Sequence, residues 1–359
     1  MAVSNDVLVT ALQELLPGYT ESWTLFHPAF DALISKGNKR TVNNPFIEFV
    51  VLPEGPGSVT TIIQGDEHIN GGRRQSAVKG SAYAATMIYA FDVPGEDLRM
   101  ANGAADVAEL IKKYPEAGLA DFQERIARQL VMGDGAGVGQ FFTLNGDTTY
   151  NPKATGAQQG MLEFRAPAAQ VTTTRFGIVS NSITNWHNQY AHITSMGGDG
   201  LKKIRKAYWD ASQQGAGSEG PVDIMLADRD SYDNYIDELT DFVQFVKRDK
   251  DVKSGDPVPH RMREGVQLHG ATLYPEPQMD RSLFTTPEAL EGVIYGLHSD
   301  SLKLFTQGSG PKTTGGDFEM RDVGRLPYQE LFRTEFVLSA GAYCTDLRRN
   351  FTVTGAANA

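Results

Sequence analysis

The sequence predicts an α+β protein built from more than one lobe. Three observations carry this prediction: a long amphipathic helix in the first half of the chain, a strand-rich stretch before it, and a mixed region after it that ends in a β meander. The 359 residues exceed the size at which one core usually stops growing, so two or three lobes are expected. The hydrophobic fraction of 40% is ample for packed cores.

The composition argues against several classes of function. The net charge of -11 argues against phosphate neutralisation as the main task, because nucleic-acid binders usually carry a basic face. The one cysteine, Cys344, excludes an internal disulfide framework and a cysteine-rich zinc site. No apolar run approaches the roughly 20 residues of a membrane helix, and the first residues lack a signal-peptide pattern. We therefore expect a soluble protein that is used in a cytoplasm or released by lysis.

Residues 1–44 predict an N-terminal arm. A short amphipathic helix ends near Pro17, and a segment with much apolar surface follows it. The large side chains of that segment include Trp23, Phe26 and Phe30. A segment this short needs another surface to lie on, which is either the core of its own chain or a neighbouring subunit.

Residues 45–98 predict a long antiparallel hairpin. Aromatic and β-branched residues are frequent in 46–52 and 83–93, and a glycine-rich turn lies between these strands. The basic residues of the turn are Arg73, Arg74 and Lys79. A two-stranded hairpin is marginally stable alone in water, so it folds back on its own domain or reaches a partner. A basic tip on an acidic protein suits docking onto an acidic neighbour, and a solvated turn is the alternative.

The long helix is predicted over residues 115–132. Apolar residues at three- and four-residue spacing define the face that would enter the core. They are Leu119, Phe122, Ile126 and Leu130. Pro115 suits the start of this helix and Gly133 suits its end. We interpret the helix as a spine against which the regions on both sides pack.

Residues 171–300 predict an α/β lobe. A helix over 200–214 would be capped by Asp199, and a second helix would be capped by Asp228. The apolar stripe of the second helix is expected to run on to Val246. The expected strands are 222–227, 266–274 and 293–297.

The sequence returns to β character after residue 300. The expected strands are 302–305, 318–323, 329–340, 343–345 and 347–354. In the last strand Leu347, Phe351 and Val353 would face one way, and most of the polar residues would face the other. We expect this terminal meander to pair with strands near the spine helix.

The motifs tested do not commit the chain to catalysis. The glycines at 133–139 follow a helix C-terminus, whose dipole is wrong for phosphate. Residues 308–313 do not match a P-loop, because Pro311 removes a backbone N–H donor. The seven histidines are scattered, and the acidic residues after 227 lack the glycine of an EF-hand. Cys344 is expected to be a buried, small apolar residue. No catalytic, metal or cofactor-binding residue is predicted.

Three stretches carry a resemblance to a known family. They are the hairpin return 83–98 with the helix 119–132, the strand-like run 293–304, and the segment 325–331 with its continuation through 344–355. On these stretches the chain resembles the major capsid proteins of tailed bacteriophages, which have the HK97 fold. The resemblance spans 45–355.

The resemblance implies a division of the chain into five parts. They are an N-terminal arm (1–44), an E-loop β-hairpin (45–98), a P-domain part with the spine helix (99–139), an A domain (140–295) and closing P-domain strands (296–359). We expect inter-subunit interfaces at the E-loop tip and in the arm. Their expected residues are Arg73, Arg74 and Lys79 in the tip and Trp23, Phe26 and Phe30 in the arm.

The resemblance also implies a function and partners. Members of the family assemble as hexamers and pentamers into an icosahedral head around double-stranded DNA, in the cytoplasm of the host bacterium. The implied partners are other copies of the chain, scaffold and portal proteins, and, as a further option, decoration proteins. Too few residues precede the hairpin for the N-terminal scaffolding domain of some members, which favours a separate scaffold or none. Some members cross-link an E-loop lysine to an asparagine, but no acceptor for Lys79 stands out.

Other classes of protein remain as alternatives. An encapsulin-type cellular nanocompartment would share the fold but enclose enzymes, and encapsulins are typically shorter, with a smaller A domain. A soluble enzyme of an unrecognised family would be a compact monomer with a bound small molecule. A phage tail-tube protein would lack the long spine helix.

Overall fold

The structure is a computed structural model. It describes residues 39–44, 46–51, 77–94, 118, 121–122, 124–132, 143–144, 160–164, 166, 174–179, 186–213, 221–239, 245–246, 265–268, 270–279, 292–307, 318–325 and 331–357. The arm residues Trp23, Phe26 and Phe30 and the hairpin residues Arg73 and Arg74 lie outside these ranges.

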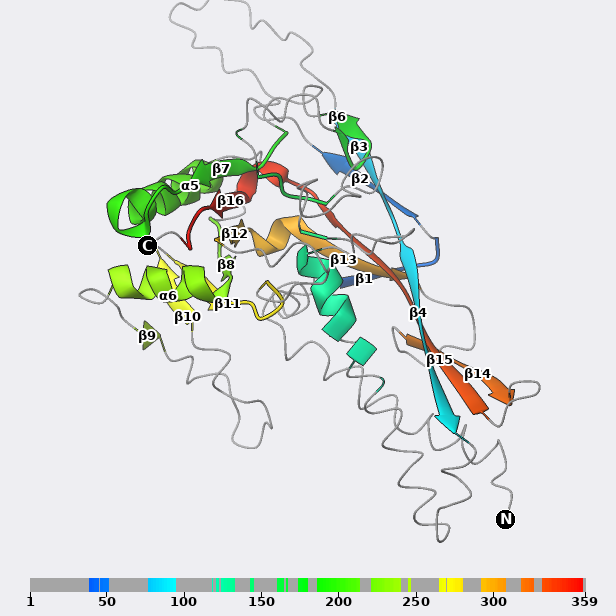
Figure 1. Ribbon diagram of the computed structural model, residues 1–359. Helices are drawn as coiled ribbons and strands as arrows, with labels where there is room; N and C mark the ends of the chain where they lie inside the picture. The colour runs from blue at the N-terminus through cyan, green and yellow to red at the C-terminus, as the bar shows by residue number, and fades with distance from the viewer. Residues whose placement is uncertain are drawn as a thin grey trace, which may run out of the picture.

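The first of two main sheets is built around one long strand (Figure 1). Its strands are β1 (Lys39–Val42), β4 (Ala85–Pro94), β13 (Leu302–Gln307), β14 (Phe318–Arg325) and β15 (Leu331–Cys344). The order is β1-β13-β15-β14, and β4 also pairs with β15. Strand β15 was expected as two shorter strands, but it is continuous and is antiparallel to β4, β13 and β14. It therefore holds the first sheet together.

The second sheet is mixed and has the order β7-β16-β12-β8-β11-β10-β9. Its strands are β7 (Gln189–His192), β8 (Ile224–Ala227), β9 (Phe245–Val246), β10 (Gly265–Leu268), β11 (Ala271–Pro275), β12 (Ile294–Leu297) and β16 (Phe351–Thr354). Strand β16 is parallel to β7 and antiparallel to β12. The last strand of the chain therefore lies inside this sheet.

Helices α5 (Leu201–Gln213) and α6 (Arg229–Glu238) pack against the second sheet. Buried residues of α5 recur at helical spacing and share a core with Met225 and Phe351 of the sheet. The Asp228 side chain accepts a hydrogen bond from Ser231 N at 3.3 Å, which confirms the predicted cap of α6.

A helix at the centre of the molecule includes residues 121–122 and 124–132. Phe122, Ile126 and Leu130 are buried, and Leu119 lies outside the described residues. The helix contacts elements of both sheets. The ring of Phe122 stacks on Tyr89 of β4 at 5.7 Å, and Arg128 Nε lies 3.3 Å from Gln278 Oε1 in the turn after β11.

Several local predictions in the α/β region were wrong. Helix α6 ends at Glu238, and Val246 lies in strand β9, which pairs with β10. The single strand expected at 266–274 is the β10–β11 hairpin, whose turn contains Gly270 at a φ of 106°. Asp199 lies inside a π-helical turn before α5, and Ser195 occupies the N-cap position of that turn. Tertiary pairing and local turn geometry override the periodic pattern at these sites.

The closing segment 296–359 also differs from its prediction. It does not form one unit, because β13–β15 lie in the first sheet and β16 lies in the second. The expected strand 347–354 begins instead with a 3-10 turn, Leu347–Arg349, before β16. The terminal meander therefore connects the two sheets and does not pair entirely beside the central helix.

Candidate functional site

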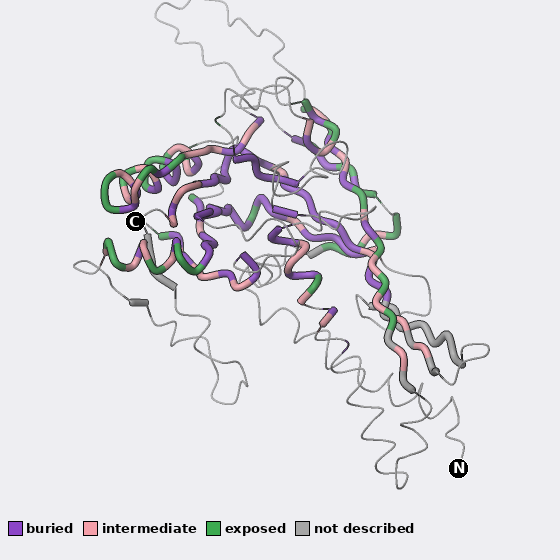
Figure 2. The backbone as a smooth tube through the Cα atoms, viewed as in Figure 1, coloured by how far each residue is buried: buried purple, intermediate pink, exposed green. Residues whose placement is uncertain are grey.

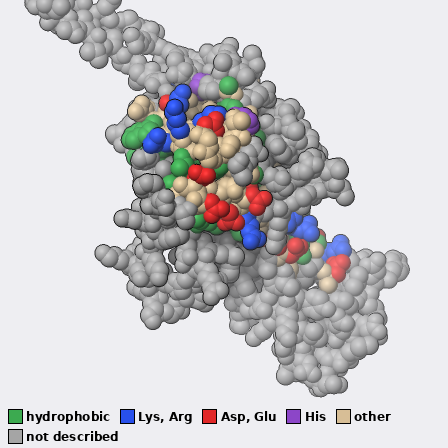
Figure 3. Space-filling view, turned by 60° about the vertical axis from the view of Figure 1, so that its left-hand side comes forward, with side chains coloured by type: hydrophobic (Ala, Val, Ile, Leu, Met, Phe, Trp, Pro, Cys, Tyr) green, Lys and Arg blue, Asp and Glu red, His purple; other side chains and the backbone are tan. Residues whose placement is uncertain are grey.

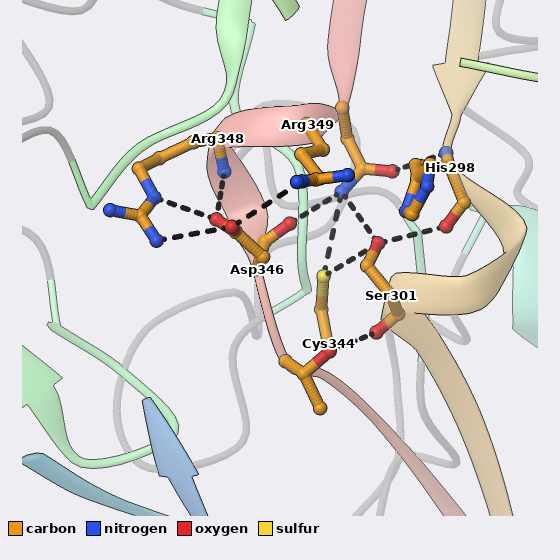
Figure 4. Close-up of polar contacts among 8 residues, drawn as sticks. His298, Ser301, Cys344, Asp346, Arg348 and Arg349 are labelled. Carbon is orange, nitrogen blue, oxygen red and sulfur yellow. Dashed lines mark hydrogen bonds and ion pairs between the residues drawn. The ribbon is translucent and has the colours of Figure 1, made fainter. Parts of the chain in front are cut away.

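The chain crosses between the two sheets twice at the same place (Figure 4). One crossing joins β12 to β13 through His298 and the 3-10 turn Ser299–Ser301. The other joins β15 to β16 through residues 345–350. The two crossings touch, because Thr345 N donates to Ser301 O at 2.8 Å. We call this contact region the junction.

Asn350 joins the two crossings through its side chain. Its Oδ1 accepts a hydrogen bond from His298 N at 2.9 Å, and its Nδ2 donates to Asp346 O at 3.1 Å. The same Nδ2 lies 3.4 Å from Ser301 Oγ and from Cys344 Sγ. Asn350 is fully buried. One side-chain amide therefore forms hydrogen bonds with backbone groups that lie outside the strands and have no partner in a β-sheet.

A buried carboxylate next to Asn350 lies between two arginines. Arg348 donates from Nε and Nη2 to the two oxygens of Asp346 at 2.7 and 3.0 Å. Arg349 Nε lies 3.7 Å from Asp346 Oδ2. All three residues are buried. Two-point pairing is the strong form of this interaction, and removal of one partner would leave a charge in the interior.

A second polar cluster lies along the adjoining strand β16. Thr352 Oγ1 donates to Glu163 O at 2.7 Å. Asn188 forms a reciprocal pair with the backbone of Glu163, at 2.9 and 3.0 Å. The Glu163 carboxylate accepts from Arg175 at 2.5 Å, with both side chains buried. The polar side of β16 therefore packs against the segment 160–164.

The junction contains residue types of nucleophilic catalysis without the geometry that they need. Ser301 Oγ donates to the backbone oxygen of His298 at 2.8 Å, and Cys344 is fully buried. Burial raises the pKa of the Cys344 thiol to about 12, so the thiolate nucleophile is scarce near neutral pH. Among the described residues no group of three or more His, Cys, Asp or Glu residues could hold a metal ion. The arrangement can hold two sheets together.

The hairpin of β2 (Phe46–Val51) and β3 (Val78–Tyr83) alternates strictly between buried and exposed residues on β2 (Figure 2). On its inner face the ring of Phe49 lies 4.7 Å from that of Tyr343. On its outer face Phe46, Val50 and Tyr83 are 42%, 57% and 51% exposed. This base of the hairpin therefore packs on its own chain, and its other face exposes three large apolar side chains beside the exposed ion pair of Glu48 and Lys79. We call Phe46, Val50 and Tyr83 the outer hairpin face.

Lys79 does not lie in the turn of the hairpin. It lies within β3 opposite Val50, and its Nζ is 3.4 Å from Glu48 Oε2. Both side chains are largely exposed. This position corrects its assignment to the basic tip. The structure does not bring Lys79 together with Arg73 and Arg74 or with the arm residues, which lie outside the described ranges.

Sequence reasoning missed the junction. The alternation in 347–354 suggests that Arg348, Asn350 and Thr352 face solvent, yet all three are buried. The available signal was the sequence Asp346-Leu347-Arg348-Arg349, which places three charges shortly before the strand Phe351–Thr354, with its alternating apolar residues and threonines.

In the described part of the chain, no helix is long and apolar enough to cross a membrane.

The arrangement of the two sheets, the hairpin and the central helix recurs in solved structures. The chain is similar in structure to a chain of the cyanophage A-1(L) capsid asymmetric unit, with a TM-score of 0.59, 13% identity, and coverage of 91% of this chain and 92% of that one. It is also similar to the capsid of an empty GTA particle, with a TM-score of 0.52, 10% identity, and coverage of 90% and 89%.

A further similar structure is the SrpI encapsulin complex from Synechococcus elongatus, with a TM-score of 0.47, 11% identity, and coverage of 88% and 84%. No family model matches the sequence, and no curated protein matches it. The likeness to the cyanophage capsid chain and to the capsid of the GTA particle shows that the chain has the HK97-like capsid fold.

Proposed function

We propose that the chain is a major capsid protein whose copies assemble into the shell of a bacteriophage head. Hexamers and pentamers would build an icosahedral shell that encloses double-stranded DNA. The observation that carries this proposal is the fold, because the likeness to the cyanophage capsid subunit extends over 91% of this chain and 92% of that one. The role is structural and needs no catalytic group.

The outer hairpin face supports assembly. It exposes two aromatic rings, Phe46 and Tyr83, whose centroids lie 6.2 Å apart. Exposed apolar side chains on a two-stranded sheet gain stability when a neighbour covers them. Repeated contacts between different surfaces of identical copies close into rings or shells when the rotation permits.

The remaining interfaces and partners belong to the same proposal. The E-loop tip with Arg73 and Arg74 and the N-terminal arm with Trp23, Phe26 and Phe30 would contact neighbouring subunits. Scaffold and portal proteins would direct assembly in the cytoplasm of the host bacterium, and decoration proteins could bind the finished head. The net charge of -11 suits a container that holds DNA without gripping it.

Negative-stain electron microscopy of the purified recombinant chain, with and without a co-expressed scaffold, tests this proposal. We expect closed polyhedral shells or rings of one size. A field of small monodisperse monomers under every condition would contradict the proposal.

Charge reversal at the hairpin tip tests one interface within the shell. Arg73→Glu with Arg74→Glu should impair assembly and leave the folded subunit intact, as judged by circular dichroism. The matched control is Arg73→Lys with Arg74→Lys, which keeps the charge and should assemble. Correct shells from the charge-reversed variant would remove the tip from the assembly interface. Deletion of residues 1–34 tests the arm in the same way.

A further inference from the structure

Helices α5 and α6 carry opposite charge. Helix α5 contains four basic residues and one acidic residue, whereas α6 contains one basic residue and four acidic residues. Both helices contribute buried residues to the same core cluster on the second sheet. Figure 3 shows the corresponding face, where lysine and arginine side chains gather mainly above and aspartate and glutamate side chains mainly below.

The basic side chains of α5 form a stripe along the helix. Lys202, Arg205 and Lys206 are exposed and share one side of the helix at three- and four-residue spacing, and Trp209, which is 47% exposed, continues that side. We call these four residues the basic stripe. Within the described part of the chain none of its three charged side chains forms an ion pair.

Lys203 provides the contrast with the stripe. Its Nζ contacts the carboxylate of Asp199 and donates to His192 O at 2.6 Å. The same carboxylate accepts from Thr194 N at 3.2 Å. Lys203 therefore ties the start of α5 to the end of β7. Within the described residues the three charged side chains of the basic stripe make no such ion pair, and the ring of Trp209 packs edge-on against Tyr208 at 5.8 Å.

The acidic side chains of α6 form a matching stripe. Asp230, Asp233 and Asp237 are exposed and recur at three- and four-residue spacing, and Asp233 Oδ2 lies 3.8 Å from Nε of the exposed Arg229 at the start of the helix. We call the three aspartates the acidic stripe. At a rise of about 1.5 Å per residue, α5 is about 20 Å long and α6 is about 15 Å long. The basic stripe runs from residue 202 to 209 and the acidic stripe from 230 to 237, so each is about 10 Å long.

We propose that the basic stripe of one copy docks against the acidic stripe of a neighbouring copy. The occupant is a second copy of this chain because the complementary surface is present on the chain itself, with opposite charge and similar length. Such a contact joins two different surfaces, so it can repeat from subunit to subunit around a ring. Complementary charge would fix the register of neighbours and exclude wrong contacts. The inference that these contacts close into a ring depends on the proposed shell function.

Reciprocal charge reversal tests this contact. One variant carries Lys202→Glu, Arg205→Glu and Lys206→Glu, and the other carries Asp230→Lys, Asp233→Lys and Asp237→Lys. Association is measured by sedimentation velocity at low and high salt, and particles are counted by electron microscopy. Each variant alone should associate at least about tenfold more weakly than the unmodified chain, with the difference reduced at high salt.

Restoration is the decisive part of the test. The variant with all six reversals should associate like the unmodified chain, because it exchanges the two charges. An equal mixture of the two triple variants should form even-numbered rings, since copies must alternate, and it should fail to form pentamers. The control Lys202→Arg, Arg205→Lys and Lys206→Arg keeps the charge and should assemble normally. Circular dichroism and thermal melting establish that each variant is folded.

The outcomes separate this inference from the shell proposal. If the unmodified chain forms shells and both folded triple variants form them equally well, the stripe contact is wrong and the shell proposal stands. If both triple variants fail to associate, and neither the variant with all six reversals nor the mixture restores association, the stripes do not pair with each other. If only the α5 variant is impaired and it also loses co-purifying nucleic acid, the basic stripe binds nucleic acid and the proposal is overturned.

Discussion

The junction and the outer hairpin face distribute polar and apolar side chains in opposite ways. The junction buries the charges of Asp346 and Arg348, whereas the hairpin exposes the rings of Phe46 and Tyr83. At the junction two chain crossings leave the sheets, and side chains must satisfy their backbone groups. On the hairpin the ladder between β2 and β3 pairs backbone groups without help from side chains, and apolar exposure suits a neighbouring subunit. Changes at the junction should therefore impair folding, and changes on the outer hairpin face should impair assembly.

The largest effect is expected at Arg348. Arg348→Met would leave the buried Asp346 carboxylate without its two-point partner, with the backbone N–H of residue 348 at 3.2 Å and Arg349 Nε at 3.7 Å still beside it, so we expect a loss of about 3 kcal/mol in the free energy of unfolding. Urea denaturation of the dissociated subunit measures it. Arg125→Met removes an arginine that is 66% exposed and should cost less than about 1 kcal/mol.

A double variant separates the contribution of the buried charge to stability from that of side-chain packing. Adding Asp346→Asn to Arg348→Met removes the uncompensated charge and should recover part of the lost stability. Equal stability of Arg348→Met and the unmodified chain would show that the junction does not hold the sheets together.

The next largest effect is expected at Gly296 in β12. A Cβ atom there would lie 2.0–2.3 Å from the ring of Phe351, which is fully buried in β16. Gly296→Ala should therefore cost about 1–3 kcal/mol through overpacking. Gly198→Ala is the control, because the nearest atoms to its Cβ are 3.8 Å away. Similar thermal melting of the two variants would mean that β12 and β16 are not closely packed.

A smaller effect is expected at Thr352. Thr352→Val keeps the shape of the side chain but removes the hydrogen bond to Glu163 O, so we expect a cost of about 1–2 kcal/mol. The matched control is Thr86→Val on β4, where the hydroxyl contacts Ser339 at the exposed surface. The control should change stability by less than about 0.5 kcal/mol. If Thr352→Val left the stability unchanged, the Thr352 hydroxyl would not be a buried hydrogen-bond donor, and this side of β16 would be exposed to solvent.

The smallest effect is expected at the pair of Asp92 and Arg333 in the first sheet, whose side chains are 32% and 35% exposed. Arg333 bonds both carboxylate oxygens at 2.8 and 2.9 Å and holds the pKa of Asp92 below its ordinary value of 3.8. The folded state therefore gains stability from this pair above about pH 4, and loses it as the pH falls through the lowered pKa.

The matching experiment compares unfolding curves of Arg333→Gln and the unmodified chain from pH 6 to pH 2. The stability difference should be small at pH 6 and should disappear at the acidic end. A difference that grows as the pH falls would contradict the assigned role of this pair.

The sequence predicted features that depend on near neighbours. The cap by Asp228 needs only residues three positions apart, and the alternation in 46–51 needs only period two. The exposed Phe46 and the buried Phe49 follow from that alternation only once the structure identifies the face that packs on Tyr343. Local pattern therefore gave the element, and the tertiary contact gave its orientation.

The junction could not be predicted because its partners are distant in sequence. Thr352 bonds the backbone of Glu163, and Asn350 bonds that of His298. A polar residue that alternates with apolar ones in a strand is normally interpreted as exposed. Only the pairing of β16 inside the second sheet reveals that both of its faces are covered.

Two phenylalanines on opposite faces of β2 test the separation of folding from assembly most directly. For Phe46→Ala and Phe49→Ala we would measure subunit unfolding in urea and particle formation by sedimentation velocity on the same preparations. We predict that Phe49→Ala loses about 3–5 kcal/mol of stability, while Phe46→Ala keeps a stable subunit and loses most of its particles. Normal particle formation by Phe46→Ala would contradict the assembly role of the outer hairpin face.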